Sequence, residues 1–142
     1  MRFSLVLALS VLFVAGCGST ASSRPKDVPK PDVEIRTLGD MFFGSGRTAP
    51  LTLEVGISNP ASRPLIVRRI RVESPGMVQY GIQPTERIFR ETLQPGEGRV
   101  LALTVTAIAG SSRLNATEPL TLRAWIDFEI DGKRFRELYL VR

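Results

Sequence analysis

"LRAWIDFEIDGKRFRELYLV", residues 122–141, is the clearest indication of the fold in this chain. Two runs of alternating apolar and polar residues flank Asp131-Gly132, a dipeptide typical of two-residue β-hairpin turns. With that turn, one register satisfies both faces, because opposite charges meet on the outer face and apolar side chains meet on the inner face. The predicted outer pairs are Glu129–Arg134 and Asp127–Arg136, and the predicted inner pairs are Phe128–Phe135, Ala124–Tyr139 and Leu122–Val141.

This register leaves one position that fits badly. Glu137 falls opposite Ile126, on the face that otherwise carries apolar side chains. A β-bulge or the end of the sheet is therefore expected near this pair.

The register also places three large apolar side chains on the charged face, namely Trp125, Leu138 and Leu140. Such a group needs a cover, for which there are two alternatives. Either the N-terminal strand around residues 35–43 or a loop lies over it, or a partner protein docks there. In the second case Arg123 and Arg136 form part of the polar rim.

The acidic side chains of Asp127, Glu129 and Asp131 share that outer face and resemble a cation site. Two of the three already have arginine partners across the predicted hairpin. We therefore expect no metal site, and no cofactor.

The chain between residues 33 and 121 is predicted to consist of further strands. Residues 51–58 and 101–107 alternate in the same way, and turn residues stand at 74–76, 95–96 and 110–112. Residues 84–93 fit either a strand or a short helix capped by Thr85, and the strand is preferred. Short strands separated by turn signals predict an all-β fold, an antiparallel sandwich or barrel.

Four arginines cluster in "NPASRPLIVRRIRVES", residues 59–74, namely Arg63, Arg68, Arg69 and Arg71. Strict alternation would turn Ile70 and Val72 outward, and one extra residue at Arg68-Arg69 returns them to the core, which predicts a β-bulge. The cluster is interpreted mainly as protection of a sheet edge. The functional alternative is a strip that binds anions such as lipid phosphates or an acidic partner.

The N-terminal residues form a targeting segment. A positive end is followed by the apolar run "LVLALSVLFV" and by small residues before the only cysteine, Cys17. About ten apolar residues suit a signal peptide and are too few to span a bilayer. After Cys17 comes "GSTASSRPKDVPKPD", which has too few apolar residues to fold and is expected to be a flexible tether. The predicted organisation is a signal peptide over 1–16, a tether over 17–32 and one domain over 33–142.

The tetrapeptide "VAGC" resembles the lipobox of bacterial lipoproteins. That resemblance implies acylation of Cys17, cleavage before it and attachment to membrane lipid. Gly18 stands where the family carries Asp in proteins retained at the inner membrane. The resemblance therefore implies the periplasmic face of the outer membrane.

The domain resembles a second family, the late-embryogenesis-abundant, water-stress type of β-sandwich. The resemblance rests on "LTLEVGISNPASRPLIVRRIRVES" and "LQPGEGRVLALTVTA", within residues 51–74 and 93–107. It implies a seven-stranded immunoglobulin- or fibronectin-III-like sandwich without a catalytic centre and with a stress-related role.

Composition argues against catalysis and nucleic-acid binding. The chain has no histidine, the commonest general base, and its one cysteine is expected to carry lipid. The net charge of +5 is spread along the chain, as on an ion-paired surface. The expected function is a non-catalytic, membrane-anchored module of the bacterial envelope that binds an envelope protein or supports structure. The alternative is a carrier that holds a small ligand or lipid between its sheets.

Overall fold

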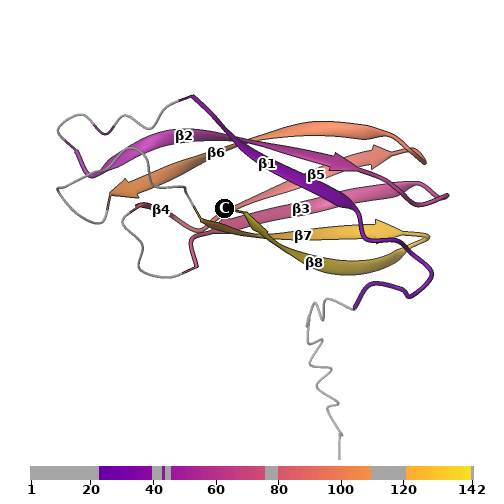
Figure 1. Ribbon diagram of the computed structural model, residues 1–142. Coiled ribbons are helices and arrows are strands. Elements are labelled where there is room, and N and C mark those ends of the chain that lie inside the picture. Colours follow the sequence, from indigo (N-terminus) through magenta and orange to yellow (C-terminus); the bar gives the residue numbers. More distant parts are fainter. Residues whose placement is uncertain (1–22, 40–42, 44–45, 76–79, 110–120, 142) are drawn as a thin grey trace, which may run out of the picture.

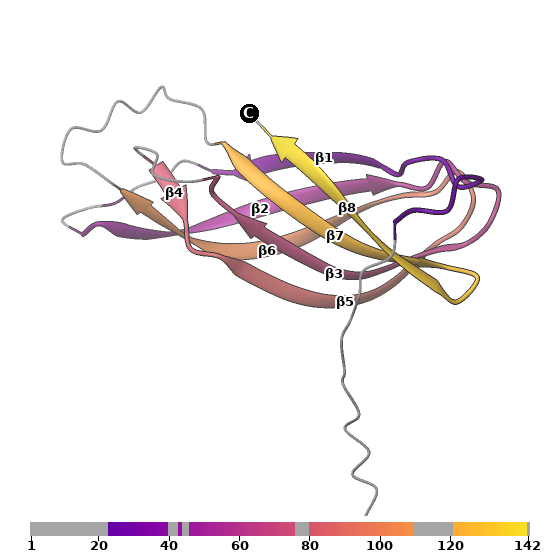
Figure 2. The ribbon, with the colours of Figure 1, turned by 90° about the horizontal axis from the view of Figure 1, so that it is seen from below.

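The chain folds into eight β-strands, seen in a computed structural model that describes residues 23–39, 43, 46–75, 80–109 and 121–141. The strands are β1 (Asp32–Leu38), β2 (Thr48–Ser58), β3 (Leu65–Glu73), β4 (Tyr80–Ile82), β5 (Thr85–Leu93), β6 (Gly98–Ala109), β7 (Leu122–Ile130) and β8 (Lys133–Val141). They form two antiparallel four-stranded sheets, ordered β1-β2-β6-β4 and β5-β3-β7-β8, which face each other as two layers (Figures 1 and 2). The all-β sandwich is thus confirmed, and residues 85–93 are strand. Eight strands are described where seven were predicted, and the three-residue β4 is the shortest.

The β7–β8 hairpin has the predicted register. All five predicted pairs are opposed, and the register continues without a shift from Leu122–Val141 to Ile130–Lys133. Asp131 and Gly132 have φ values of 48° and 74°, the two positive angles that a type I′ turn requires. The bulge expected near Glu137 is absent, so that prediction was wrong.

The core lies between the sheets and is built from the inward residues of both. Phe128 and Phe135 lie side by side near the hairpin turn with ring centroids 5.5 Å apart, and both are at most 1% exposed. Buried side chains of β2 and β6 in the opposite sheet belong to the same core cluster, including Leu53, Val55 and Leu103.

The β-bulge predicted in β3 is confirmed. Its pairing with β5 and with β7 shifts between Val67 and Arg69. As a result Leu65, Val67, Ile70 and Val72 all point inward and are fully buried. The edge-protection interpretation was wrong, because β3 lies between β5 and β7 in the interior of its sheet.

Asn59 ties two loops together at one end of the sandwich. It is 1% exposed, and its amide nitrogen donates hydrogen bonds to the carbonyl oxygens of Arg63, Leu93 and Gln94 at 2.9–3.2 Å. Its side-chain oxygen accepts a bond from the Ala61 amide at 3.0 Å. The Asn-Pro sequence therefore does more than end β2, because it joins the β2–β3 loop to the β5–β6 turn.

Residues 24–31 pack against the sandwich; we call them the strap. Val28 is 1% exposed and belongs to the core, and the Tyr139 hydroxyl donates to the carbonyl oxygen of Pro31 at 2.8 Å. The tether predicted over residues 17–32 is therefore too long at its C-terminal end. One aliphatic side chain, this hydrogen bond and three ion pairs, described below, hold the segment in place. Residues 1–22, including the predicted signal peptide and Cys17, lie outside the described residues.

No helix in the described ranges is long and apolar enough to cross a membrane.

Replacement of Ile126 by Ala should lower the free energy of unfolding by about 2–5 kcal/mol, because the side chain is fully buried between the sheets. Ile88→Ala is the matched control, since Ile88 is 71% exposed, and it should change stability by less than about 0.5 kcal/mol. Urea unfolding measures both. Equal effects of the two substitutions would show that the faces of the sheet are assigned incorrectly.

Replacement of Val28 by Ala should cost about 1–3 kcal/mol in the same measurement, because the strap contributes this side chain to the core. Val100→Ala serves as control, since Val100 is 62% exposed. A Val28 variant as stable as the unmodified chain would show that residues 24–31 do not pack against the core and belong to the flexible tether.

Candidate binding surface

The outer face of the β5-β3-β7-β8 sheet is crossed by a row of alternating charges. Arg69 on β3 contacts Glu86 on β5 at 3.2 Å and Asp127 on β7 at 2.8 Å. Arg136 on β8 donates two hydrogen bonds to the same Asp127, at 2.6 and 3.1 Å. This row links all four strands of the sheet, because the register brings its members into line.

A second row lies nearer the hairpin turn. Glu129 accepts from Arg68 at 2.9 Å and from Arg134 at 3.2 Å. The Arg68 hydrogen bond is the main reason why the pKa of Glu129 is lowered, and Arg134 adds to it. Burial alone would raise the pKa of Asp127, but Arg136 and Arg69 outweigh it and leave that pKa lowered.

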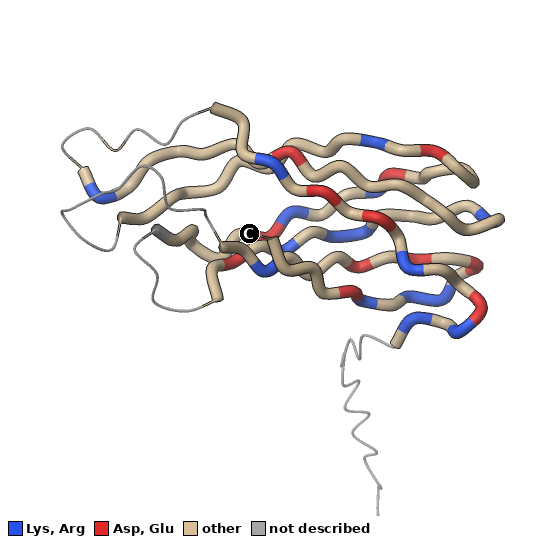
Figure 3. Tube along the Cα trace, viewed as in Figure 1, with Lys and Arg blue, Asp and Glu red and all other residues tan. Residues whose placement is uncertain are grey.

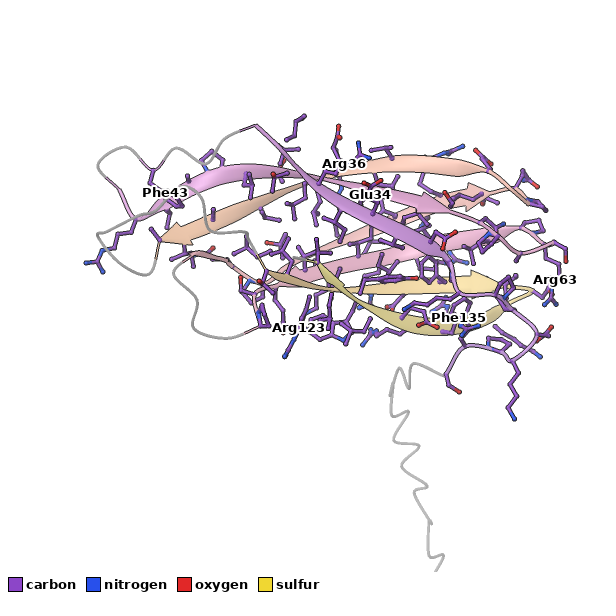
Figure 4. The ribbon with its side chains drawn as sticks, in the orientation of Figure 1. Glu34, Arg36, Phe43, Arg63, Arg123 and Phe135 are labelled. Atoms are coloured by element: carbon purple, nitrogen blue, oxygen red, sulfur yellow. The ribbon has the colours of Figure 1, made fainter. Side chains whose placement is uncertain are left out.

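The four arginines of the predicted anion strip are separated and paired. Arg63 lies at the hairpin-turn end (Figure 4), where it contacts Asp27 of the strap at 2.6 Å and Asp131 at 2.5 Å. Those contacts raise the pKa of Arg63 and lower that of Asp27. Arg71 pairs with Glu73 at 3.0 Å. Since Arg68 and Arg69 are also bound to carboxylates, the cluster is a network of ion pairs rather than an open strip.

The other end of the same face is apolar. Trp125 is opposite Leu138, and Arg123 is opposite Leu140, in adjacent rows of the hairpin. Leu138 is 44% exposed and Leu140 is 66% exposed, whereas Trp125 is partly buried beneath the Arg71 guanidinium, 5.7 Å from its ring. We call Trp125, Leu138 and Leu140 the apolar patch. Figure 4 shows Arg123 at this end of the sheet, far from Arg63.

Strand β1 is not the predicted cover, and residues 40–42 and the loop at 110–120 lie outside the described residues. β1 pairs with β2 in the opposite sheet, so it does not lie over the apolar patch. Of the predicted rim residues, Arg123 is exposed at the patch, whereas Arg136 is held by Asp127 in the neighbouring row.

The strap supplies contacts that the sequence analysis missed. Arg24 donates to Glu137 at 2.8 Å and to the carbonyl oxygen of Val28, and Lys30 lies 4.0 Å from Glu137 and over the Tyr139 ring. Burial, followed by the charge of Glu137, raises the pKa of Tyr139. The sequence did contain a signal for these contacts. Glu137 is a single carboxylate in an otherwise apolar row of the hairpin, and such a group needs a cationic partner from outside the hairpin.

A shallow groove lies on the opposite face of the molecule. It is lined by the outer residues of β1, β2 and β6, where Gly56 and Gly98 have no side chains to fill it. The rim carries Glu34 and Arg99, and Arg99 is itself bound to Glu91 and Glu97 at 2.6 Å.

Charged residues are distributed unevenly over the molecule. Figure 3 shows Lys, Arg, Asp and Glu along the β3, β7 and β8 strands and along the strap, whereas the ends of β2 and β6 away from the strap are largely uncharged. Among the described residues, no group of three or more acidic, histidine or cysteine side chains is placed to hold a metal ion.

Comparisons with known proteins show the fold alone. No family model matches the chain, and no curated protein matches it. An X-ray structure of a Northeast Structural Genomics Consortium target is similar over 79% of this chain and 84% of its own, with a TM-score of 0.51 and 7% identity. The putative ApaA protein of Bordetella pertussis covers 80% of this chain and 95% of its own (TM-score 0.46, 15% identity). A FixG-related protein of Vibrio parahaemolyticus covers 81% and 95% (TM-score 0.37, 15% identity).

The charge rows should make stability depend on acid pH. The pKa values of Asp127 and Glu129 are lowered from ordinary values of 3.8 and 4.5, so their contribution is complete above those values and is lost as pH falls through the lower folded values. Urea midpoints should therefore decrease steadily below about pH 4.5.

Asp127→Asn tests the assignment. This variant should be less stable at neutral pH, because Arg69 and Arg136 lose their shared partner, and its stability should fall less on acidification. Asp32→Asn is the control, since Asp32 forms no ion pair in the described part of the chain. A pH profile for Asp127→Asn parallel to that of the unmodified chain would show that the charge rows do not cause the loss of stability in acid.

Proposed function

We propose that the chain is a membrane-anchored, non-catalytic lipoprotein of the bacterial envelope whose β-sandwich serves as a binding module. The observation that carries the proposal is the apolar patch, an exposed hydrophobic group on a face that is otherwise ion-paired. Large apolar side chains grouped beside charged ones are typical of interaction sites. The anchor follows from "VAGC" and the apolar run before it, and the membrane is most simply the outer one, on its periplasmic face.

The sandwich is proposed to be of the immunoglobulin or fibronectin III type. Without the short β4, seven strands remain, with β1-β2-β6 in one sheet and β5-β3-β7-β8 in the other. The chain changes sheets between β2 and β3, between β5 and β6 and between β6 and β7, as in the Greek-key connections of such domains. The likeness to the water-stress sandwiches gains support from Asn59, whose hydrogen bonds give the shared Asn-Pro a structural purpose.

The non-catalytic assignment rests on the chemistry of the available groups. The chain has no histidine, and Cys17 is assigned to lipid. The carboxylates of Asp127 and Glu129 on the outer face of the β5-β3-β7-β8 sheet are held by arginines, which keeps them ionised and occupied. The carrier alternative lacks support from the described residues, because the space between the sheets is filled by buried side chains such as Phe128 and Phe135.

Cys17→Ala tests the anchor. In a bacterial host, the unmodified chain should incorporate radiolabelled palmitate and should fractionate with membranes. The variant should take up no label, and it should be released or remain as an uncleaved precursor. Ser19→Ala is the control, since it leaves "VAGC" intact and should behave as the unmodified chain does. Absence of acyl mass on residue 17 of the unmodified chain would remove the lipoprotein assignment.

A further inference from the structure

The apolar patch differs from the other exposed hydrophobic residues of the molecule. Leu38, Ile88 and Val100 are 58%, 71% and 62% exposed, and they lie on three different strands, β1, β5 and β6. Leu138 and Leu140 instead stand two residues apart on one face of β8, beside Trp125. Single exposed residues are ordinary, whereas a contiguous exposed group is typical of an interaction site.

The strap determines how far this patch is from the lipid anchor. Arg24 contacts Glu137, the residue directly before Leu138 on β8, and Lys30 and Pro31 contact Tyr139, the residue directly after it. Arg24 follows Cys17 by seven residues, which span at most about 25 Å when fully extended. A bilayer that holds acyl chains on Cys17 therefore lies within reach of the patch.

The charges around the patch suit a phospholipid surface. Arg123 is exposed between Leu140 on β8 and Glu73 on β3, and it forms no ion pair with the described residues, since Glu73 is paired with Arg71 at 3.0 Å. On the side towards the hairpin turn, Arg136 is already neutralised by Asp127. An uncommitted guanidinium beside a tryptophan and two leucines matches the layered chemistry of a membrane interface, in which phosphates lie above apolar chains.

We propose that the apolar patch docks on the phospholipid surface in which Cys17 is anchored, with Arg123 bound to a lipid phosphate. The inference rests on the proposed acylation of Cys17 and adds the orientation of the domain to it. Three side chains alone bind a membrane weakly. Anchoring of Cys17 within about 25 Å of Arg24 gives the patch a high effective concentration of lipid. A second membrane contact of this kind strengthens a single lipid anchor.

The chain from Cys17 onward provides its own probes, because Trp125 is the only tryptophan and Cys17 is the only cysteine. Removal of residues 1–16 disturbs none of the described contacts, which begin after residue 22. Cys17 is coupled through maleimide to lipid in vesicles of phosphatidylcholine, with or without phosphatidylglycerol. Trp125 emission should shift to shorter wavelength on coupling, and brominated lipids should quench it, more strongly when phosphatidylglycerol is present.

Two variants separate the patch from the anchor. Leu138→Ser combined with Leu140→Ser should couple equally well, and its quenching should fall to that of the uncoupled chain. Ile88→Ser is the matched control on the far edge of the same sheet, and it should be quenched as the unmodified chain is. Arg123→Glu should lose the additional quenching that phosphatidylglycerol gives.

Three results would overturn the inference. Trp125 emission that coupling leaves unchanged would show that the patch remains in water. A shift of the Trp125 emission that grows with protein concentration in the absence of vesicles would show that the patch binds a second copy of the chain. A photo-crosslinker at position 138 that captures an envelope protein and no lipid in native membranes would assign it to a protein. The first two results are obtained with purified chain and chemical coupling, so they do not depend on whether cells acylate Cys17, which the palmitate experiment decides separately.

Discussion

The register of the β7–β8 hairpin is the constraint on which the other features depend. A two-residue turn at Asp131-Gly132 allows one alignment, and that alignment places Phe128 against Phe135 inside and Asp127 against Arg136 outside. A slip by one residue would reverse both faces. The charge rows extend this alignment across the sheet to β3 and β5, and the apolar patch lies where the rows end.

Glu137 connects the hairpin to the N-terminal segment. Its position in the inward row would be costly without compensation, because a carboxylate loses hydration there. Arg24 and Lys30 provide the compensation, and Val28 fills the core beside them. Glu137, which fits the hairpin badly by itself, is therefore the site where the strap docks. The strap closes the sandwich between β8 and β1 (Figure 1). The same contact joins the domain to the segment that leads to Cys17.

Local patterns predicted the hairpin register and the β3 bulge, because both follow from alternation of apolar and polar residues around a turn or within one strand. For residues 84–93 the local pattern allowed both a strand and a short helix, and the preferred strand is the one observed. The order of the strands within each sheet could not be predicted from these patterns, since pairing between distant strands leaves no local signal. For this reason β3 was assigned to a sheet edge although it is interior. The strap was missed because composition alone described a tether, while its docking depends on Glu137, more than a hundred residues away. The apolar patch was predicted correctly in its members, but β1, one of its predicted covers, belongs to the other sheet.

Docking of the strap on β8 limits residue 17 to about 25 Å from Arg24, and so keeps it within reach of the apolar patch. Energy transfer from Trp125 to an acceptor on Cys17 measures this directly in the chain from Cys17 onward. Efficient transfer is predicted for the folded chain, with a marked decrease in a variant that combines Arg24→Glu with Val28→Asp while the sandwich remains folded. Transfer in the unmodified chain that equals that of the variant would show that residues 24–31 do not dock on β8, and the account of the anchor and the patch would be wrong.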